Sequence, residues 1–279
     1  QRRREKEAVI ALAPPTGTLP EAKGSGGTGS GAGRMVGAAA PFFQQALIAY
    51  NAGDVGAALE LWTRAAETGD ASAQLLVGNM YLSGEGLEAA NPEIAAGWFE
   101  RSARGGNDEA RVQLATLLRL GHGVPQDYRR AVALLYEAGT NGHAVAQIDL
   151  AELFVAGVED RVAQNVPHAM DWYRLAGKQN VALAQVKLAQ LHLEGFTGVP
   201  DEVVGLAWLN AAVRVALAPE EPEWSKRVLP LDTVIETDPD GRTLRRIIFD
   251  MADSYRAKLS ELQLKQADAY LARLDLAPL

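Results

Sequence analysis

The sequence contains no cysteine among its 279 residues. Disulfide bonds, thiolate metal sites and cysteine nucleophiles are therefore excluded. The sequence also lacks any run of about 18 uncharged apolar residues, which a membrane-spanning helix would need. Apolar residues nevertheless make up 48% of the chain. That share is enough for a sizeable core and excludes wholesale disorder.

Basic charge is scarce as well. The chain has 27 Lys and Arg against 35 Asp and Glu, so its net charge is −8. General binding to nucleic acid needs a basic surface that displaces counterions, and we expect no nucleic-acid partner. The one basic run is Arg2, Arg3 and Arg4. It is interpreted as a solvated chain end or, alternatively, as an electrostatic contact with anionic lipid or an acidic partner. Membrane contact is therefore expected to be indirect or through these three arginines.

Recognisable catalytic motifs are missing too. None of the four histidines stands in a zinc-binding pair such as H-x-x-x-H; they are His122, His143, His168 and His192. There is no G-x-S-x-G nucleophile elbow and no Gly-Lys-Ser/Thr phosphate loop. Residues 24–29 match G-x-G-x-x-G, but no strand precedes them, so we interpret the match as chance. We expect no enzyme activity, no metal and no cofactor, and the sequence singles out no carboxylate pair.

The first forty residues have little that can be buried. Residues 24–33 have the composition of a glycine-rich linker. Residues 5–13 can form only a short helix, which must dock on this chain or on a partner to be stable, and the alternative is a frayed terminus. We therefore assign residues 1–40 to a flexible arm and linker. Since the chain begins with Gln1, we also expect that a segment upstream was removed or not included.

The sequence is rich in internal repetition. From about residue 43 a large apolar residue, a small residue four positions later, a turn residue and a closing glycine recur every 36 to 38 residues. The large positions are Trp62, Phe99, Leu135, Tyr173 and Leu209, and the small positions are Ala66, Ala103, Gly139 and Gly177. The turn positions are Gly69, Gly106, Gly142 and Asn180, and the closing glycines are Gly84, Gly121, Gly157 and Gly195. Several positions in phase over four intervals indicate a solenoid of stacked units.

Each unit is predicted to contain two helices. Apolar residues at helical spacing place the first helices near 73–82, 110–119, 146–155 and 184–193. The second helices carry the large position, as in 94–103, 128–138 and 166–176. Small residues allow close helix contact, and glycines end helices in the left-handed conformation. Core packing is the expected role of Trp62, Trp98, Trp172 and Trp208.

The loops and second helices resemble those of Sel1-like repeats. The segments that carry the resemblance are 61–74, 81–86, 120–127 and 198–201. The resemblance covers about residues 43–215 and departs at 157–161, where the second loop glycine is missing. It implies an all-α, right-handed α-solenoid of stacked helical hairpins, similar to tetratricopeptide repeats, which we assign to residues 41–216. It also implies protein–protein contact in adaptor or assembly roles, and it favours a bacterial cell envelope or periplasm over the cytoplasm.

The first helices are expected to line the concave face of such a solenoid. Helical spacing from core positions places Asn79, Thr116, Glu152 and Gln190 on that face, with Arg119 one turn from Thr116. This polar face of mixed charge suits an extended peptide or a partner helix. We take these five residues as candidate partner contacts.

The repeat pattern ends after residue 216, and we assign residues 217–279 to an insertion followed by a C-terminal helical cap. The proline-rich insertion contains Trp224, a sixth candidate contact. A turn signal at 238–241 favours a short β-hairpin near 231–248, and the alternative starts a helix directly at Thr243. A capping-box pattern at 260–263 predicts the start of the last helix.

The sequence favours a non-catalytic scaffold or adaptor. A protein partner would bind the concave face, the N-terminal arm or the C-terminal insertion. The first alternative is an accessory or assembly subunit of a larger, membrane-associated complex. The second is an envelope glycan-binding module or enzyme, which the missing motifs disfavour.

Overall fold

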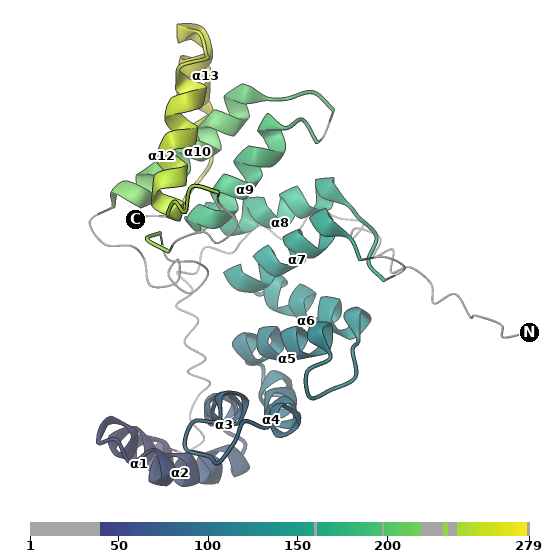
Figure 1. Ribbon diagram of the computed structural model, residues 1–279, viewed down its shortest axis with the longest axis vertical. Coiled ribbons are helices and arrows are strands. Elements are labelled where there is room, and N and C mark those ends of the chain that lie inside the picture. The colour runs from purple at the N-terminus through teal and green to yellow at the C-terminus, as the bar shows by residue number, and fades with distance from the viewer. Residues whose placement is uncertain (1–39, 159–160, 197, 219–230, 234–238, 278–279) are drawn as a thin grey trace, which may run out of the picture. The chain divides into compact units, whose positions relative to one another are not determined.

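The computed structural model describes residues 40–158, 161–196, 198–218, 231–233 and 239–277. These residues form twelve helices, and their only β-structure consists of isolated bridges such as the one between Val158 and Val162 (Figure 1). The contacts divide the chain into two compact units, one that ends at His143 and one that starts at Ala144. Each unit is described by itself.

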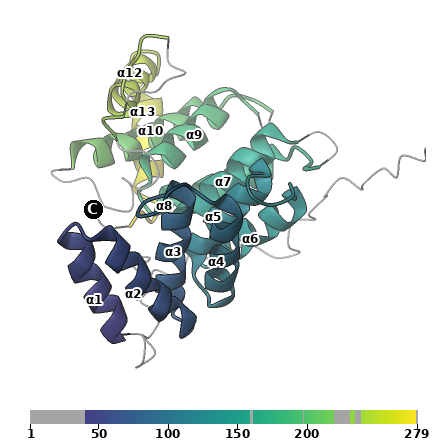
Figure 2. The same ribbon diagram turned by 60° about the horizontal axis from the view of Figure 1, so that its bottom comes forward.

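The first unit is a row of six helices in chain order. They are α1 (Ala40–Asn51), α2 (Val55–Glu67), α3 (Ala71–Ser83), α4 (Pro92–Arg104), α5 (Asp108–Leu120) and α6 (Tyr128–Thr140). Each helix packs on the next one along the chain, so the unit is a stack of helical hairpins (Figure 2). The first and second helices predicted from the sequence are confirmed here.

The second unit continues the hairpin pattern and adds a cap. Its helices are α7 (Ala144–Ala156), α8 (Val166–Lys178), α9 (Ala182–Leu193), α10 (Glu202–Leu217), α12 (Leu244–Arg256) and α13 (Glu261–Leu271). Helices α7 to α10 pack in succession, and both α12 and α13 pack on α10. Ser260 and Gln263 form the capping box at the start of α13 that the sequence predicted. The fold is all-α, as expected.

The predicted β-hairpin is wrong in its second half, where the structure has a helix. α12 starts at Leu244, and the Thr243 side chain caps it by accepting a hydrogen bond from the backbone N–H of Arg246. Leu244, Ile248 and Ala252 are buried at a spacing of four residues, which is helical. The alternative start of a helix at Thr243 is therefore confirmed. Of the expected first strand, residues 231–233 form a turn and its end, and the rest lies outside the described residues.

Every second helix from α2 to α10 begins at an Asp or Asn. The side chain of each accepts a hydrogen bond of 2.9–3.1 Å from the backbone N–H three residues on. The capping residues are Asp54, Asn91, Asp127, Asn165 and Asp201. Such caps satisfy an otherwise unpaired N–H at a helix start. They form another position in phase with the repeat, one that the sequence reasoning overlooked.

A buried side chain early in each first helix links it to its surroundings. Gln74 donates from Nε2 to the carbonyl oxygen of Ala66 at 3.0 Å, and Gln185 donates likewise to Gly177 at 2.8 Å. In α5 the equivalent residue is Arg111, which pairs with Asp108 and Glu137, each at 2.7 Å. These bonds satisfy N–H groups that are costly to bury alone, whereas the buried Oε1 atom of Gln185 has no partner among the described residues.

Small residues let neighbouring helices approach closely. Gly78 of α3 faces Phe99 of α4, and a Cβ on Gly78 would lie 2.6 Å from the Phe99 ring. Gly205 of α10 faces Leu193 in the same way, with a Cβ distance of 2.5 Å. Both distances are below normal van der Waals contact. The spacing between these helices therefore requires glycine at both positions.

Replacement of Gly78 by alanine should destabilise the first unit. The added methyl group has no room against Phe99, and overpacking of this kind costs about 1–3 kcal/mol. Gly97 is the matched control, because it lies in α4 with open space around its Cβ. Gly97→Ala should raise stability by about 0.5–1 kcal/mol through helix propensity. The check is the urea midpoint of both variants, and equal stabilisation by both would contradict the packing account.

Replacement of Asp127 by alanine should destabilise α6 by about 1 kcal/mol, because one backbone N–H loses its cap. Asp127→Asn should cost much less, since Asn91 and Asn165 cap equivalent helices. Hydrogen–deuterium exchange in residues 128–132 is the measurement. Equally fast exchange in both variants would show that charge, rather than capping, matters at this position.

Candidate functional site

The predicted contact residues of the first unit lie on its first helices. Asn79 of α3 is exposed, and Thr116 and Arg119 of α5 are half-buried. The Thr116 hydroxyl donates within its own helix to the carbonyl oxygen of Val112 at 3.1 Å. None of these three residues lines either of the two pockets described below. Their role as partner contacts stays a prediction, and Trp224 lies outside the described residues.

The two predicted residues of the second unit meet at one pocket. Glu152 of α7 and Gln190 of α9 both line it, and its volume is about 270 Å³. Most of the residues that line the pocket come from α7 and α9, and α8 contributes Tyr173. The sequence reasoning assigned Tyr173 only to the core, because it occupies the large position of its repeat. Spacing alone gave no signal that this side chain also reaches a pocket.

Tyr173 is the chemically distinctive residue of this pocket. Its side chain is only 2% exposed, and its hydroxyl forms no hydrogen bond with any described residue. Burial raises the pKa of the phenol well above its usual range, and the carboxylates of Glu152 and Asp149 raise it further. The hydroxyl therefore stays neutral and keeps both its donor and its acceptor capacity.

The charges around the pocket are mainly negative. Glu152 and Glu194 contribute two carboxylates, and Lys187 contributes the one ammonium group of the lining. The pocket also lies at the C-terminal ends of two helices, because α7 ends at Ala156 and Glu194 is the C-cap of α9. Helix C-termini carry partial negative charge. A cation is therefore better suited to this pocket than an anion.

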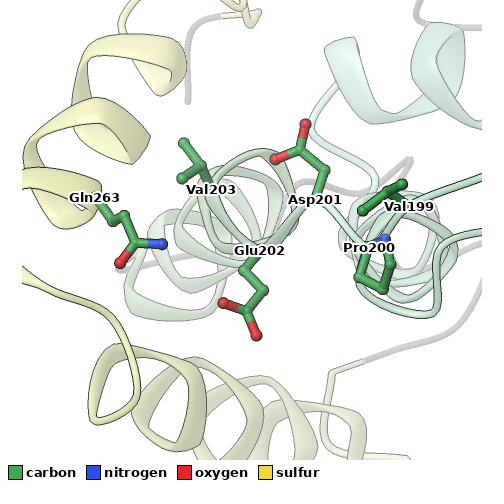
Figure 3. Close-up of a pocket in the computed structure, with 6 residues that line it drawn as sticks. All are labelled: Val199, Pro200, Asp201, Glu202, Val203 and Gln263. Carbon is green, nitrogen blue, oxygen red and sulfur yellow. The ribbon is translucent and has the colours of Figure 1, made fainter.

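A larger hollow of about 540 Å³ lies where the start of α10 faces α13 (Figure 3). In this view the carboxylates of Asp201 and Glu202 point in opposite directions. The Asp201 carboxylate is occupied as the cap of α10, and the Gln263 amide is occupied in the capping box of α13. Two of its polar side chains therefore serve helix starts, and the smaller pocket, where the predicted residues Glu152 and Gln190 meet, is the better candidate site.

The histidines have structural roles where their contacts are defined. His168 is buried against Phe154 and accepts a hydrogen bond at Nε2 from Trp172 Nε1 at 3.2 Å. Burial lowers its pKa, which favours the neutral ring that this contact needs. The Nε2 atom of His143 lies 3.3 Å from the Oε2 atom of Glu109. No three His, Asp or Glu side chains gather into a metal site in the described part of the chain.

Three of the four repeat tryptophans have the predicted core role. Trp62, Trp172 and Trp208 are buried. Trp98 is only half-buried, and the Arg101 guanidinium lies 4.4 Å from the centre of its ring. Among the described helices, none combines the length and apolar character needed to cross a membrane.

Solved structures share the fold of this chain. A Sel1 repeat protein from Oxalobacter formigenes aligns over 77% of this chain and 87% of its own, with a TM-score of 0.57 and 20% identity. A protective antigen present in uropathogenic Escherichia coli strains displays an SLR fold. It aligns over 85% of this chain and 68% of its own, with a TM-score of 0.51 and 18% identity. At these identities the likeness concerns the fold alone.

Sequence comparison finds a closer match over a shorter segment. An uncharacterized protein of Neisseria meningitidis serogroup B is 41% identical over 97 residues, which are 35% of this chain and 19% of that protein. The model of the Sel1 repeat matches five times, at residues 52–70, 71–107, 108–143, 144–181 and 182–214. These matches cover more than half of the sequence, and the boundaries between successive matches fall in the turns between second and first helices. The chain therefore belongs to the Sel1 repeat family.

Proposed function

We propose that this chain is a non-catalytic scaffold that holds a protein partner against the exposed sides of its first helices, α3 and α5 in the first unit and α7 and α9 in the second. Sel1 repeat proteins generally mediate protein–protein interaction and are typically non-catalytic scaffolds. The proposal gives that general role a location on this chain.

The observation that carries the proposal is the pocket formed by α7 and α9. Helical spacing predicted Glu152 and Gln190 as contacts independently, and both line it. Neither side chain forms a hydrogen bond or ion pair with a described residue. Polar side chains that do no structural work at a concave site are what a binding face offers to a partner.

The face of α3 supports the same interpretation. Asn79 is exposed, and its side chain forms no hydrogen bond with the described residues. In α4, by contrast, Glu100 pairs with Arg104 at 3.0 Å and also with Arg130 of α6. Ion pairs of this kind occupy polar groups of second helices within the fold. Asn79 of α3, Glu152 of α7 and Gln190 of α9 remain available, because their side chains form no such pairs with described residues.

A second candidate role is that of a subunit within a larger complex. The specific observation is the apolar surface of α1, where Ile48 is 69% exposed and Leu47 is 41% exposed. Tyr50 is partly exposed beside them and donates to Glu85 at 2.9 Å. Adjacent exposed apolar side chains favour a neighbour that covers them. A scaffold whose α1 packs on another subunit would satisfy both roles.

Photo-cross-linking tests the proposed face. A benzoylphenylalanine residue is introduced in the natural source at Asn79 or Glu152, on first helices. Matched positions on second helices are Glu93 of α4 and Asp171 of α8. The proposal expects the same protein adduct from both first-helix positions and little from the matched positions. Adducts confined to Glu93 and Asp171, or no adduct at any position, would contradict it.

A further inference from the structure

The pocket between α7 and α9 has a chemistry specific enough to identify the group that it binds. We infer that it is a subsite for one basic side chain, an arginine or lysine of an extended segment of the partner. This inference deepens the proposed function and rests on it. It adds the chemical class of the group recognised at Glu152, Tyr173 and Glu194.

The first support is the uncommitted hydroxyl of Tyr173. More than nine-tenths of this residue is buried, and the hydroxyl has no hydrogen-bond partner among the described residues. The hydroxyl oxygen is not one of the fully buried polar atoms that lack a partner, so the exposed part of this residue includes its polar end. That end is the part that can serve the pocket that the residue lines. A ligand that donates an N–H to the hydroxyl oxygen would therefore find an accessible acceptor that no other residue occupies.

The second support is the charge of the lining. Glu152 and Glu194 form no ion pair among the described residues, and Lys187 pairs with neither of them. Asp149 adds a further carboxylate close enough to act on the Tyr173 hydroxyl. The C-terminal ends of α7 and α9 carry partial negative charge and make the electrostatic potential of the pocket more negative. A carboxylate or phosphate group would be repelled here, whereas a guanidinium or ammonium group would be attracted.

The third support is the apolar rim. Phe196 follows α9 and is 50% exposed, and Val155 and Leu191 also line the pocket. Long basic side chains pack their aliphatic stems on such surfaces and keep the charged head at polar groups. An aromatic ring also attracts a nearby cation. The stem would lie against the rim while the head reaches Tyr173 and Glu152.

The size of the pocket agrees with a single side chain. Its volume of about 270 Å³ lies below the range of about 300–1,000 Å³ that is usual for small-molecule sites. An extended partner segment can lie across the first helices and insert one residue into it. Affinity at this subsite alone is therefore expected to be weak, with specificity coming from the charge of the inserted residue.

A pair of capped peptides tests the inference on the full chain. The probe is acetyl-Gly-Ala-Arg-Ala-Gly-amide, and its control carries citrulline, which has nearly the shape of arginine without the charge. Backbone amide shifts are followed by NMR during titration. We expect saturable shifts in residues 152–156 and 187–196 with the arginine peptide, and affinity at least about tenfold weaker with citrulline. Equal affinity, shifts elsewhere or no saturation would overturn the subsite.

Four variants sharpen the test. Glu152→Gln should weaken the arginine peptide about tenfold, and Tyr173→Phe about fivefold. Lys187→Gln should strengthen it several-fold by removing a like charge, which no purely structural role predicts. Tyr173→Phe should leave the melting temperature unchanged or higher, because its hydroxyl has no partner to lose. Glu202→Gln on α10 makes the same charge change outside the pocket and should have no effect on peptide affinity.

The subsite and the scaffold fail in different ways. If cross-links form at Asn79 and Glu152 but arginine and citrulline peptides bind alike, the scaffold is supported and the subsite is overturned. If the peptides are discriminated but no protein is cross-linked, the pocket for a basic side chain is supported and the protein scaffold is overturned.

Discussion

The close approach of consecutive helices is the constraint on which the rest of this structure depends. Gly78 leaves room for the Phe99 ring at a position where even a methyl group would collide, and Gly205 does the same for Leu193. From α1 to α6 and from α7 to α10, the main contacts within each unit join helices that are neighbours along the chain, and α12 and α13 both cap α10. Stability is then a sum over neighbouring interfaces, as in other repeat proteins. The core lies between helices, so side chains such as Asn79, Glu152 and Gln190 of the first helices make no hydrogen bond or ion pair within the described part of the fold.

Regular helix ends give this packing a regular repeat, on which the proposed binding face depends. The seven helices from α2 to α8 each contain 13 residues. Asp or Asn caps start the second helices, and left-handed glycines such as Gly84 and Gly121 end first helices. Equal lengths keep equivalent residues in phase from one repeat to the next. That phase brings Glu152 and Gln190, in different repeats, to one pocket above Tyr173.

The repeat made most of the fold predictable from the sequence, whereas features that depend on three-dimensional context were missed. Helix positions followed from periodicity, and the capping box at Ser260 followed from a local pattern. The hairpin near 231–248 was wrong because a strong turn signal outweighed the helical spacing of Leu244 and Ile248. The contact of Tyr173 with the pocket was not predicted, because sequence spacing cannot distinguish a core residue from a core residue that also lines a pocket. Spacing predicted Glu152 and Gln190 as contacts in separate repeats, but only the structure shows that both line one pocket.

The most direct test of the account is hydrogen–deuterium exchange of the intact chain, alone and bound to the partner that cross-linking identifies. The account predicts increased protection of amides in α3, α5, α7 and α9, strongest near the pocket at 152–156 and 187–196. The second helices α4, α6 and α8 should change little. Protection confined to the second helices, with the first helices unchanged, would contradict the claim that the first helices form the binding face.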